Sequence, residues 1–258
     1  MSASRVLLLV AVALPPPALE ALGPMTAEHT VDTPWGPIGP MAERAHPNGS
    51  IFLVQPYFGL PTRVDPRATV WAARQLDALR VIGWDAGISL HRLLHRGDTL
   101  IVDDYIDNTH HQPITLFEDQ GVSGIKQVPA FCPQIRAALR EALPNAIDGG
   151  VYVAVDGPRR ETVAEARLYR MWGGDAIGQN LIPEAVLAKE LGLCYAGLLT
   201  IVDHAADLPA EPATGAVRAA LRAVVDALPQ VALALAYELT CECRQAIANV
   251  SERLPRRE

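Results

Sequence analysis

The sequence predicts an α/β fold, with a mostly parallel sheet covered by helices on both faces. Its 258 residues suit one large α/β domain, or two small domains as a weaker interpretation. Half of the residues are hydrophobic and 20% are charged, so the chain can bury a sizeable core. Short apolar, β-branched runs alternate with helical patterns along the chain, which is the order typical of a parallel sheet.

The first element is an apolar run over residues 6–14, which we interpret as a buried strand stopped by the three prolines 15–17. These nine residues are too few to span a membrane. The alternative is a secretory signal over residues 1–21, with Arg5 before the apolar core and a poor cleavage site at residues 18–21. We favour the strand because the run has a strand's length and Met1 is retained, and we therefore expect a cytoplasmic protein.

Five further strands are predicted from short runs rich in β-branched residues. They lie at residues 50–55, 80–84, 99–103, 150–155 and 197–202. Two acidic residues directly follow strands in this pattern, Asp85 after residues 80–84 and Asp203 after residues 197–202. Because open α/β sheets bind ligands at the carboxyl ends of their strands, we expect both carboxylates at that edge.

Helical patterns lie between or after these strands. They cover residues 68–79, 133–143, 162–173, 183–191, 214–228 and 231 to about 254. Thr162 is the expected N-cap of its helix, with Glu165 at the spacing of a capping box. Glu184 follows Pro183 at the expected start of another helix, where the dipole favours an acid. Residues 205–215 form a Pro/Ala/Asp loop long enough to be a lid or an active-site flap.

Composition and motifs exclude several classes of function. The chain has 22 basic and 29 acidic residues, a net charge of −7, and shows no basic patch, so we expect no nucleic-acid partner. No Rossmann, P-loop, nucleophile-elbow or HExxH motif occurs, so we expect a small-molecule substrate and no cofactor. Four cysteines in a chain of this length do not make a disulfide framework.

We also expect no metal site. Cys241 and Cys243 stand too close for a usual zinc pair and have no second pair beside them in the sequence, so we interpret them as two cysteines on a helix. His110 and His111 are adjacent, and adjacent side chains diverge, so at most one of them faces a site. We interpret this histidine pair as part of a polar loop.

Several motifs in colinear order over about residues 30–206 resemble one enzyme family. They are Val31-Asp-Thr-Pro-Trp-Gly-Pro37, Arg67-Ala-Thr-Val-Trp-Ala72, Asp104-Tyr-Ile-Asp107, Phe131-Cys-Pro133, Gly157-Pro-Arg-Arg-Glu-Thr162, Gly178-Gln-Asn-Leu-Ile-Pro-Glu184 and Leu193-Cys-Tyr-Ala196. This set resembles the methylthioadenosine phosphorylase branch of the purine nucleoside phosphorylase family. The resemblance implies one α/β domain over residues 1–258, a central mixed twisted sheet flanked by helices, and a homotrimer. It also implies a nucleoside whose anomeric carbon is attacked by phosphate.

The positions that would bind phosphate depart from that family. Its first strand ends in Gly-Gly and a Ser or Thr, but here residues 10–14 lead into three prolines, which lack N–H donors for an anion. Its Arg-His-Gly run corresponds here to the uncharged residues 55–59, and Asp85 stands at a Thr position. A carboxylate facing phosphate at about 4 Å costs several kcal/mol, so the sequence predicts a pocket that does not favour phosphate.

The resemblance also assigns candidate site residues. Asp203 stands where the family places an Asn or Asp that binds the purine N7 and assists protonation of the leaving base. Ala205 replaces the second Asp of the adenine-specific branch. Gln179 and Asn180 replace a Met and a Thr, and Arg160 stands where a Phe often stacks on the purine. Arg160 could pair with a carboxylate of the protein or bind one of the substrate.

Aromatic side chains complete the expected pocket, and three functions stay open. We expect Trp84, Tyr57 and Phe58 to contact the substrate. In the first function, Asp203 protonates or holds a leaving base and Asp85 activates water, so the enzyme is a glycosidic C–N hydrolase. In the second, the same pocket performs isomerisation or cyclisation on a specialised metabolite. In the third, the chain is an inactive binding subunit, because a fold does not guarantee an activity.

Overall fold

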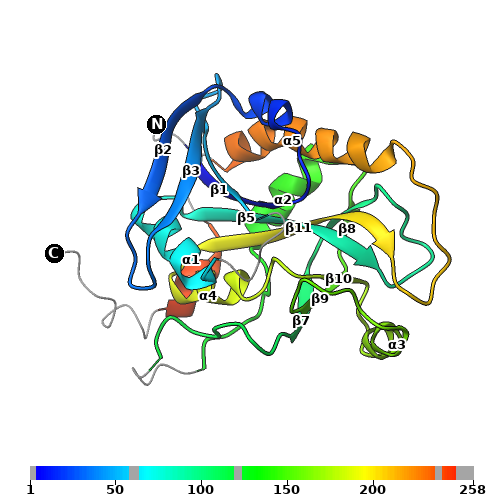
Figure 1. Cartoon of the computed structure of the whole chain (residues 1–258). Coiled ribbons are helices and arrows are strands. Elements are labelled where there is room, and N and C mark those ends of the chain that lie inside the picture. The colour runs from blue at the N-terminus through cyan, green and yellow to red at the C-terminus, as the bar shows by residue number, and fades with distance from the viewer. Residues whose placement is uncertain (1–3, 58–63, 119–123, 236–239, 248–258) are drawn as a thin grey trace.

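The described strands form one mixed sheet with helices on both faces (Figure 1). The structure is a computed structural model that describes residues 4–57, 64–118, 124–235 and 240–247. The strands are β1 (Arg5–Ala11), β2 (Met25–Val31), β3 (Ile38–Ala45), β4 (Ile51–Pro56), β5 (Arg80–Ser89), β6 (Thr99–Ile101), β7 (Asp104–Asn108), β8 (Ile147–Asp148), β9 (Val151–Val155), β10 (Ala176–Gly178) and β11 (Cys194–His204). The helices are η1 (Pro16–Leu22), α1 (Pro66–Gln75), α2 (Pro133–Ala142), α3 (Val163–Met171), α4 (Glu184–Glu190), α5 (Ala216–Ala234) and η3 (Glu242–Ile247).

The centre of the sheet is parallel and its margins are mixed. β1 pairs in parallel with β4 and β5, and β5 also pairs in parallel with β11. β2, β3 and β4 pair in antiparallel fashion, as do β5 and β10. The predicted α/β class and the mixed sheet implied by the resemblance are therefore confirmed. The carboxyl ends of β1, β5 and β11 lie together at one edge of the sheet.

The first apolar run is a strand, as predicted. β1 is buried along nearly its whole length and lies between β4 and β5 in the middle of the sheet. Removal of residues 1–21 as a signal would therefore take away a central strand. Within the described residues, no helix is both long and apolar enough to cross a membrane.

Two apolar cores lie on opposite faces of the sheet. α1 and α4 cover one core, and α2 and α5 cover the other. Side chains of β5 alternate between these cores, with Val81 in the first and Ile82 and Trp84 in the second. Asp85 therefore points to the α1/α4 face, opposite to its neighbour Trp84.

Two predicted features differ from the structure, and a third is confirmed. β2 and β3 are absent from the predicted elements, because both are partly exposed and carry polar residues. The helix expected over residues 214–228 continues through Pro229 to Ala234 as α5, and so includes the start of the helix expected over 231 to about 254. Of the rest of that second helix, η3 covers Glu242–Ile247, and residues 236–239 and 248–254 lie outside the described residues. The capping box at Thr162 is confirmed, because its side chain accepts from the Glu165 N–H and Glu165 accepts from the Thr162 N–H.

Candidate active site

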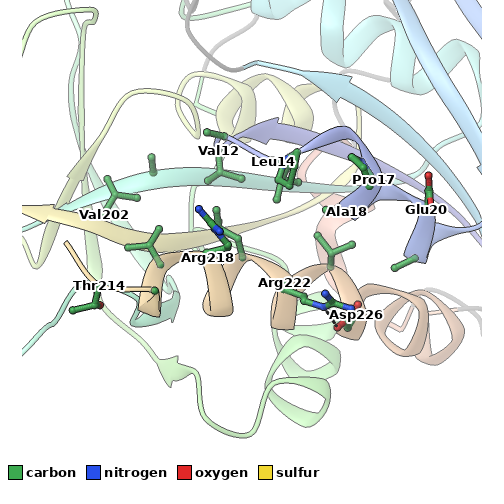
Figure 2. A pocket seen from close by; sticks show the side chains of 18 residues that line it. Val12, Leu14, Pro17, Ala18, Glu20, Val202, Thr214, Arg218, Arg222 and Asp226 are labelled. Carbon is green, nitrogen blue, oxygen red and sulfur yellow. Dashed lines mark ion pairs between the residues drawn. The ribbon is translucent and has the colours of Figure 1, made fainter.

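Two adjoining cavities lie at the carboxyl ends of the central strands. The larger, about 1350 Å³, lies between the turn that follows β1 and the helix α5. Figure 2 shows Val12 and Leu14 from that turn across the cavity from Arg218 on α5. The smaller cavity, about 400 Å³, is lined by Asp85, Arg160, Gln179 and Asn180 among others. Ala86 and Val202 line both cavities, so the two are neighbours.

Arg160 and Asp203 meet at this edge. The Arg160 Nη1 donates to Asp203 Oδ2 at 2.9 Å, and Arg96 Nη1 lies 3.4 Å from the other carboxylate oxygen. Burial raises the pKa of Asp203, but the hydrogen bond from Arg160, the His204 N–H and the two guanidinium charges outweigh it. The net pKa lies below its usual value, so Asp203 is a carboxylate at neutral pH and accepts hydrogen bonds.

Asp85 is held by five donors. Its Oδ2 accepts from the Tyr152 hydroxyl at 2.8 Å and from the N–H groups of Gln179 and Asn180 at 2.8 and 3.0 Å. Its Oδ1 accepts from the Ala86 N–H at 2.8 Å and from Asn180 Nδ2 at 2.7 Å. Burial raises the pKa of Asp85 and these hydrogen bonds limit the rise. A carboxylate has about four lone-pair sites, so these donors occupy all of them.

The glycine that precedes Gln179 allows this close approach. A Cβ at Gly178 would collide with the Asp85 carboxylate and with the ring of Tyr152. Asp85 therefore anchors the turn at residues 178–180 to the middle of β5, and this anchoring places Gln179 and Asn180 on the cavity wall. The Asn180 Oδ1 is buried and accepts no hydrogen bond among the described residues. Gln179 Nε2 donates to the Arg159 carbonyl at 3.1 Å.

The expected aromatic contacts are not found at the cavities. Trp84, expected to contact the substrate, is buried in the α2/α5 core, donates to Thr200 Oγ1 at 3.0 Å and lines neither cavity. Its side chain faces away because neighbours on a strand alternate. Tyr57 is buried in the other core and donates to Thr69 Oγ1 at 2.5 Å, and it lines neither cavity. Phe58 lies outside the described residues.

Three residues near the site are not among those predicted from the sequence. Glu161 is buried and accepts from Arg160 Nε at 3.1 Å and from the Ala206 N–H at 3.0 Å. Arg96 approaches Asp203 from the loop before β6, and Tyr152 holds Asp85 from β9. Glu161 lies in the same sequence motif as Arg160, so the motif indicates that Glu161 is near the site. Arg96 and Tyr152 carry no such signal, because only the fold brings them to the two aspartates.

The position at which the resemblance implies phosphate offers few donors. The turn after β1 contributes Val12, Leu14 and the prolines, of which Pro15 and Pro17 line the larger cavity. Arg218 lies on the opposite wall and makes no ion pair with the described residues, whereas Arg222 pairs with Asp226. The cavity is therefore mainly apolar, with one guanidinium available for a ligand.

The loop that joins β11 to α5 borders the larger cavity. Thr214 and Gly215 line it, and Glu211 binds the Arg96 N–H at 3.0 Å and His95 Nδ1 at 2.5 Å. These bonds fasten the loop predicted as a lid to the segment before β6. The His110 and His111 pair lies elsewhere, in a loop where both bind Asp156.

Comparison with known proteins places the chain among phosphorylases. A family model described as the phosphorylase superfamily matches residues 8–236. A 6-oxopurine nucleoside phosphorylase of Pyrococcus furiosus is 33% identical over 201 residues, which cover 72% of this chain and 76% of that protein. An S-methyl-5'-thioadenosine phosphorylase of Aedes aegypti is 36% identical over 154 residues, 56% of this chain and 55% of that protein. The match thus spans about half the length of several curated relatives.

Solved structures show the same fold. A methylthioadenosine phosphorylase of Schistosoma mansoni in complex with tubercidin aligns with a TM-score of 0.81 and 22% identity, over 98% of each chain. A second structure of that enzyme, in complex with adenine, aligns with a TM-score of 0.78 over 96% of this chain. At this level of identity the likeness concerns the arrangement of strands and helices.

Proposed function

Because the chain belongs to the phosphorylase superfamily, as its motifs predicted, we propose that it cleaves the glycosidic C–N bond of a purine-nucleoside-like substrate, with water in place of phosphate. The observation that carries this proposal is the ionised Asp203 paired with Arg160, the arginine that lines the smaller cavity. A carboxylate at this position accepts a hydrogen bond from the base as the base takes up a proton. Asp203 thereby stabilises the leaving group, and the proton comes from solvent.

Charge and donor chemistry support water as the acceptor. The turn after β1 is apolar and rich in proline, and the Asp85 carboxylate lies beside it. Both features disfavour a phosphate dianion, because donors are missing and like charges repel.

Asp85 has a positioning role in this proposal. Its lone pairs are occupied by donors, so it is poorly suited to take a proton from water. It instead holds the turn that carries Gln179 and Asn180. This departs from the expectation that Asp85 is the general base.

The size of the larger cavity favours a second candidate function. At about 1350 Å³ it exceeds the volume of about 300–1,000 Å³ that is usual for small-molecule sites, and its lining is mainly apolar. A bulky apolar metabolite would fit it, which agrees with the hypothesis of isomerisation or cyclisation on a specialised metabolite. Arg218 would then bind an anionic group of that substrate.

One assay separates these functions. Purine nucleosides and their 5'-methylthio analogues are incubated with the protein, with and without inorganic phosphate, and the free base is measured by chromatography. We expect release of base and of free sugar that does not depend on phosphate. Strongly phosphate-dependent turnover of about 1 per second or more would refute the proposal. No release from any nucleoside, by contrast, would favour the second candidate or an inactive binding subunit.

We also propose that residues 1–258 form one domain that assembles as a homotrimer in the cytoplasm. One continuous sheet through the described strands supports the single domain. The resemblance supports the trimer, and the central place of β1 supports a chain that keeps its first residues. Light scattering at micromolar protein tests the trimer, and a mass near one chain would contradict it.

A further inference from the structure

Four cysteine side chains converge on the side of the molecule away from the cavities. The Sγ atoms of Cys132, Cys194, Cys241 and Cys243 all lie within 4.8 Å of one another. Cys132 and Cys194 are far from Cys241 and Cys243 in the sequence, but the fold brings them together. The expectation that Cys241 and Cys243 have no second pair of cysteines beside them is therefore wrong. All four cysteines are free thiols.

The secondary structure explains how they meet. Cys132 is the N-cap of α2, and Cys194 is the first residue of β11. The Cys132 N–H donates to the Tyr195 carbonyl at 2.7 Å, which ties the start of the helix to the start of the strand. Cys241 and Cys243 come from the last described segment, at the start of η3.

The spacing of the sulfur atoms suits one metal ion. Four thiolates at about 2.3 Å from a tetrahedral zinc lie about 3.8 Å from each other. The Sγ atoms of Cys194 and Cys241 lie 3.3 Å apart, and every other pair lies within 4.8 Å. A disulfide requires about 2.05 Å between one pair of sulfurs, and the 3.3 Å pair does not meet it.

The surroundings of the cluster suit its charge. Zinc with four thiolates carries a net charge of −2, which is costly to bury without cations nearby. Arg80 is buried, and its guanidinium interacts electrostatically with Cys132, Cys194 and Cys241. This cation lies at the start of β5, the strand that pairs with β11.

We propose that Cys132, Cys194, Cys241 and Cys243 bind a single tetrahedral zinc ion with a structural role. Four protein ligands close the coordination sphere, which is typical of structural zinc and leaves no position for a substrate. The site joins α2, β11 and the segment at η3, so it fastens the end of the described chain to the core. The four thiols lose their protons when the metal binds.

The zinc site and the cavities are separate. Cys194 begins β11 and Asp203 lies nine residues further along the same strand, a separation of roughly 30 Å at the usual rise per residue. The zinc proposal therefore does not depend on the proposed reaction, and each can be tested without the other.

Metal analysis of the full chain, expressed without an affinity tag, tests the proposal. We expect about one zinc per chain by elemental mass spectrometry. Exchange for Co²⁺ is expected to give the intense visible bands of a tetrahedral thiolate site. Cys132→Ser and Cys243→Ser are each expected to lower the zinc content about tenfold or more. A control with both His110→Ala and His111→Ala keeps its zinc, because it removes only exposed histidines.

Two results would overturn the zinc site. One is metal-free protein with four titratable thiols after purification in zinc-containing buffer. The other is a disulfide between any of these cysteines, seen as the loss of two hydrogens per bond in the intact mass under non-reducing conditions. If the serine variants fail to fold, chelation of the wild-type chain replaces them. The melting temperature is then expected to fall on chelation and to recover when zinc is added back.

Discussion

The Arg160 guanidinium donates to Asp203 Oδ2 at 2.9 Å and at the same time donates to both carboxylate oxygens of the neighbouring Glu161. One arginine thus joins the loop after β9 to the carboxyl end of β11. The Glu161 side chain is buried and accepts from the Ala206 N–H, so it fixes the position of Arg160 in turn. This network explains how Asp203 stays ionised at the carboxyl end of β11 although it is partly buried.

Substitution of Asp203 tests its proposed contact with the leaving base. Asp203→Asn keeps the shape of the side chain but removes its charge, so we expect base release to fall about a hundredfold or more. Folding should survive, because the Asp203 side chain is 37% exposed. Asp207→Asn is the matched control, since Asp207 pairs with Arg170, which lines neither cavity, whereas Asp203 pairs with Arg160, which lines the smaller one. Equal turnover by the two variants would contradict the assignment.

Removal of the Arg160 charge should change the pH dependence of the reaction. Burial raises the pKa of Asp203 and Arg160 lowers it, so Arg160→Ala leaves burial less opposed and the pKa rises. Asp203 then protonates at a higher pH, and the acidic limb of the kcat/KM profile is expected to move to higher pH. Arg160→Lys keeps a charge and should shift the limb less. An acidic limb at the same pH in all three proteins would argue against Asp203 as the ionised group.

Asp85 is expected to matter for stability as well as for activity. In Asp85→Asn, an amide NH₂ replaces one carboxylate oxygen and faces N–H or O–H donors that have lost their acceptor. We expect a loss of about 1–3 kcal/mol in the free energy of unfolding, measured with urea. An unchanged free energy with lost activity would return Asp85 to the role of general base.

The burial of Glu184 predicts that the free energy of unfolding falls as the pH rises. Burial raises its pKa from the ordinary value of 4.5 to about 8, and its Oε2 has no hydrogen-bond partner among the described residues. Because the pKa of Glu184 is raised in the folded protein, its protonated side chain contributes to stability. This contribution is fully present below about pH 4.5 and is lost as the pH rises through about 8. The slope is at most about 1.4 kcal/mol per pH unit. We expect Glu184→Gln, which cannot ionise, to flatten this dependence, as urea unfolding across the range would show. If the variant shows the same slope of unfolding free energy against pH, other groups cause the pH dependence.

The sequence by itself determined the class of fold and much of its element order. Apolar runs such as residues 80–84 and 197–202 became β5 and β11, because burial of a strand depends on its own residues. The capping box at Thr162 formed where its spacing predicted, since both partners lie within one turn of helix. Asp203 lies at the carboxyl end of β11 as predicted, whereas Asp85 lies within β5, which continues to Ser89, and is level with the last residue of β1.

Only the tertiary structure decided which side chains meet. Trp84 and Asp85 are neighbours in the sequence, yet the pleat of β5 directs them to opposite faces. The four cysteines come together because α2, β11 and η3 converge, and no local pattern contains that information. Likewise, Tyr152 on β9 and the turn at residues 178–180 saturate Asp85 with donors. Periodicity and capping act over a few residues, whereas the charge and the free lone pairs of a site depend on contacts between distant segments.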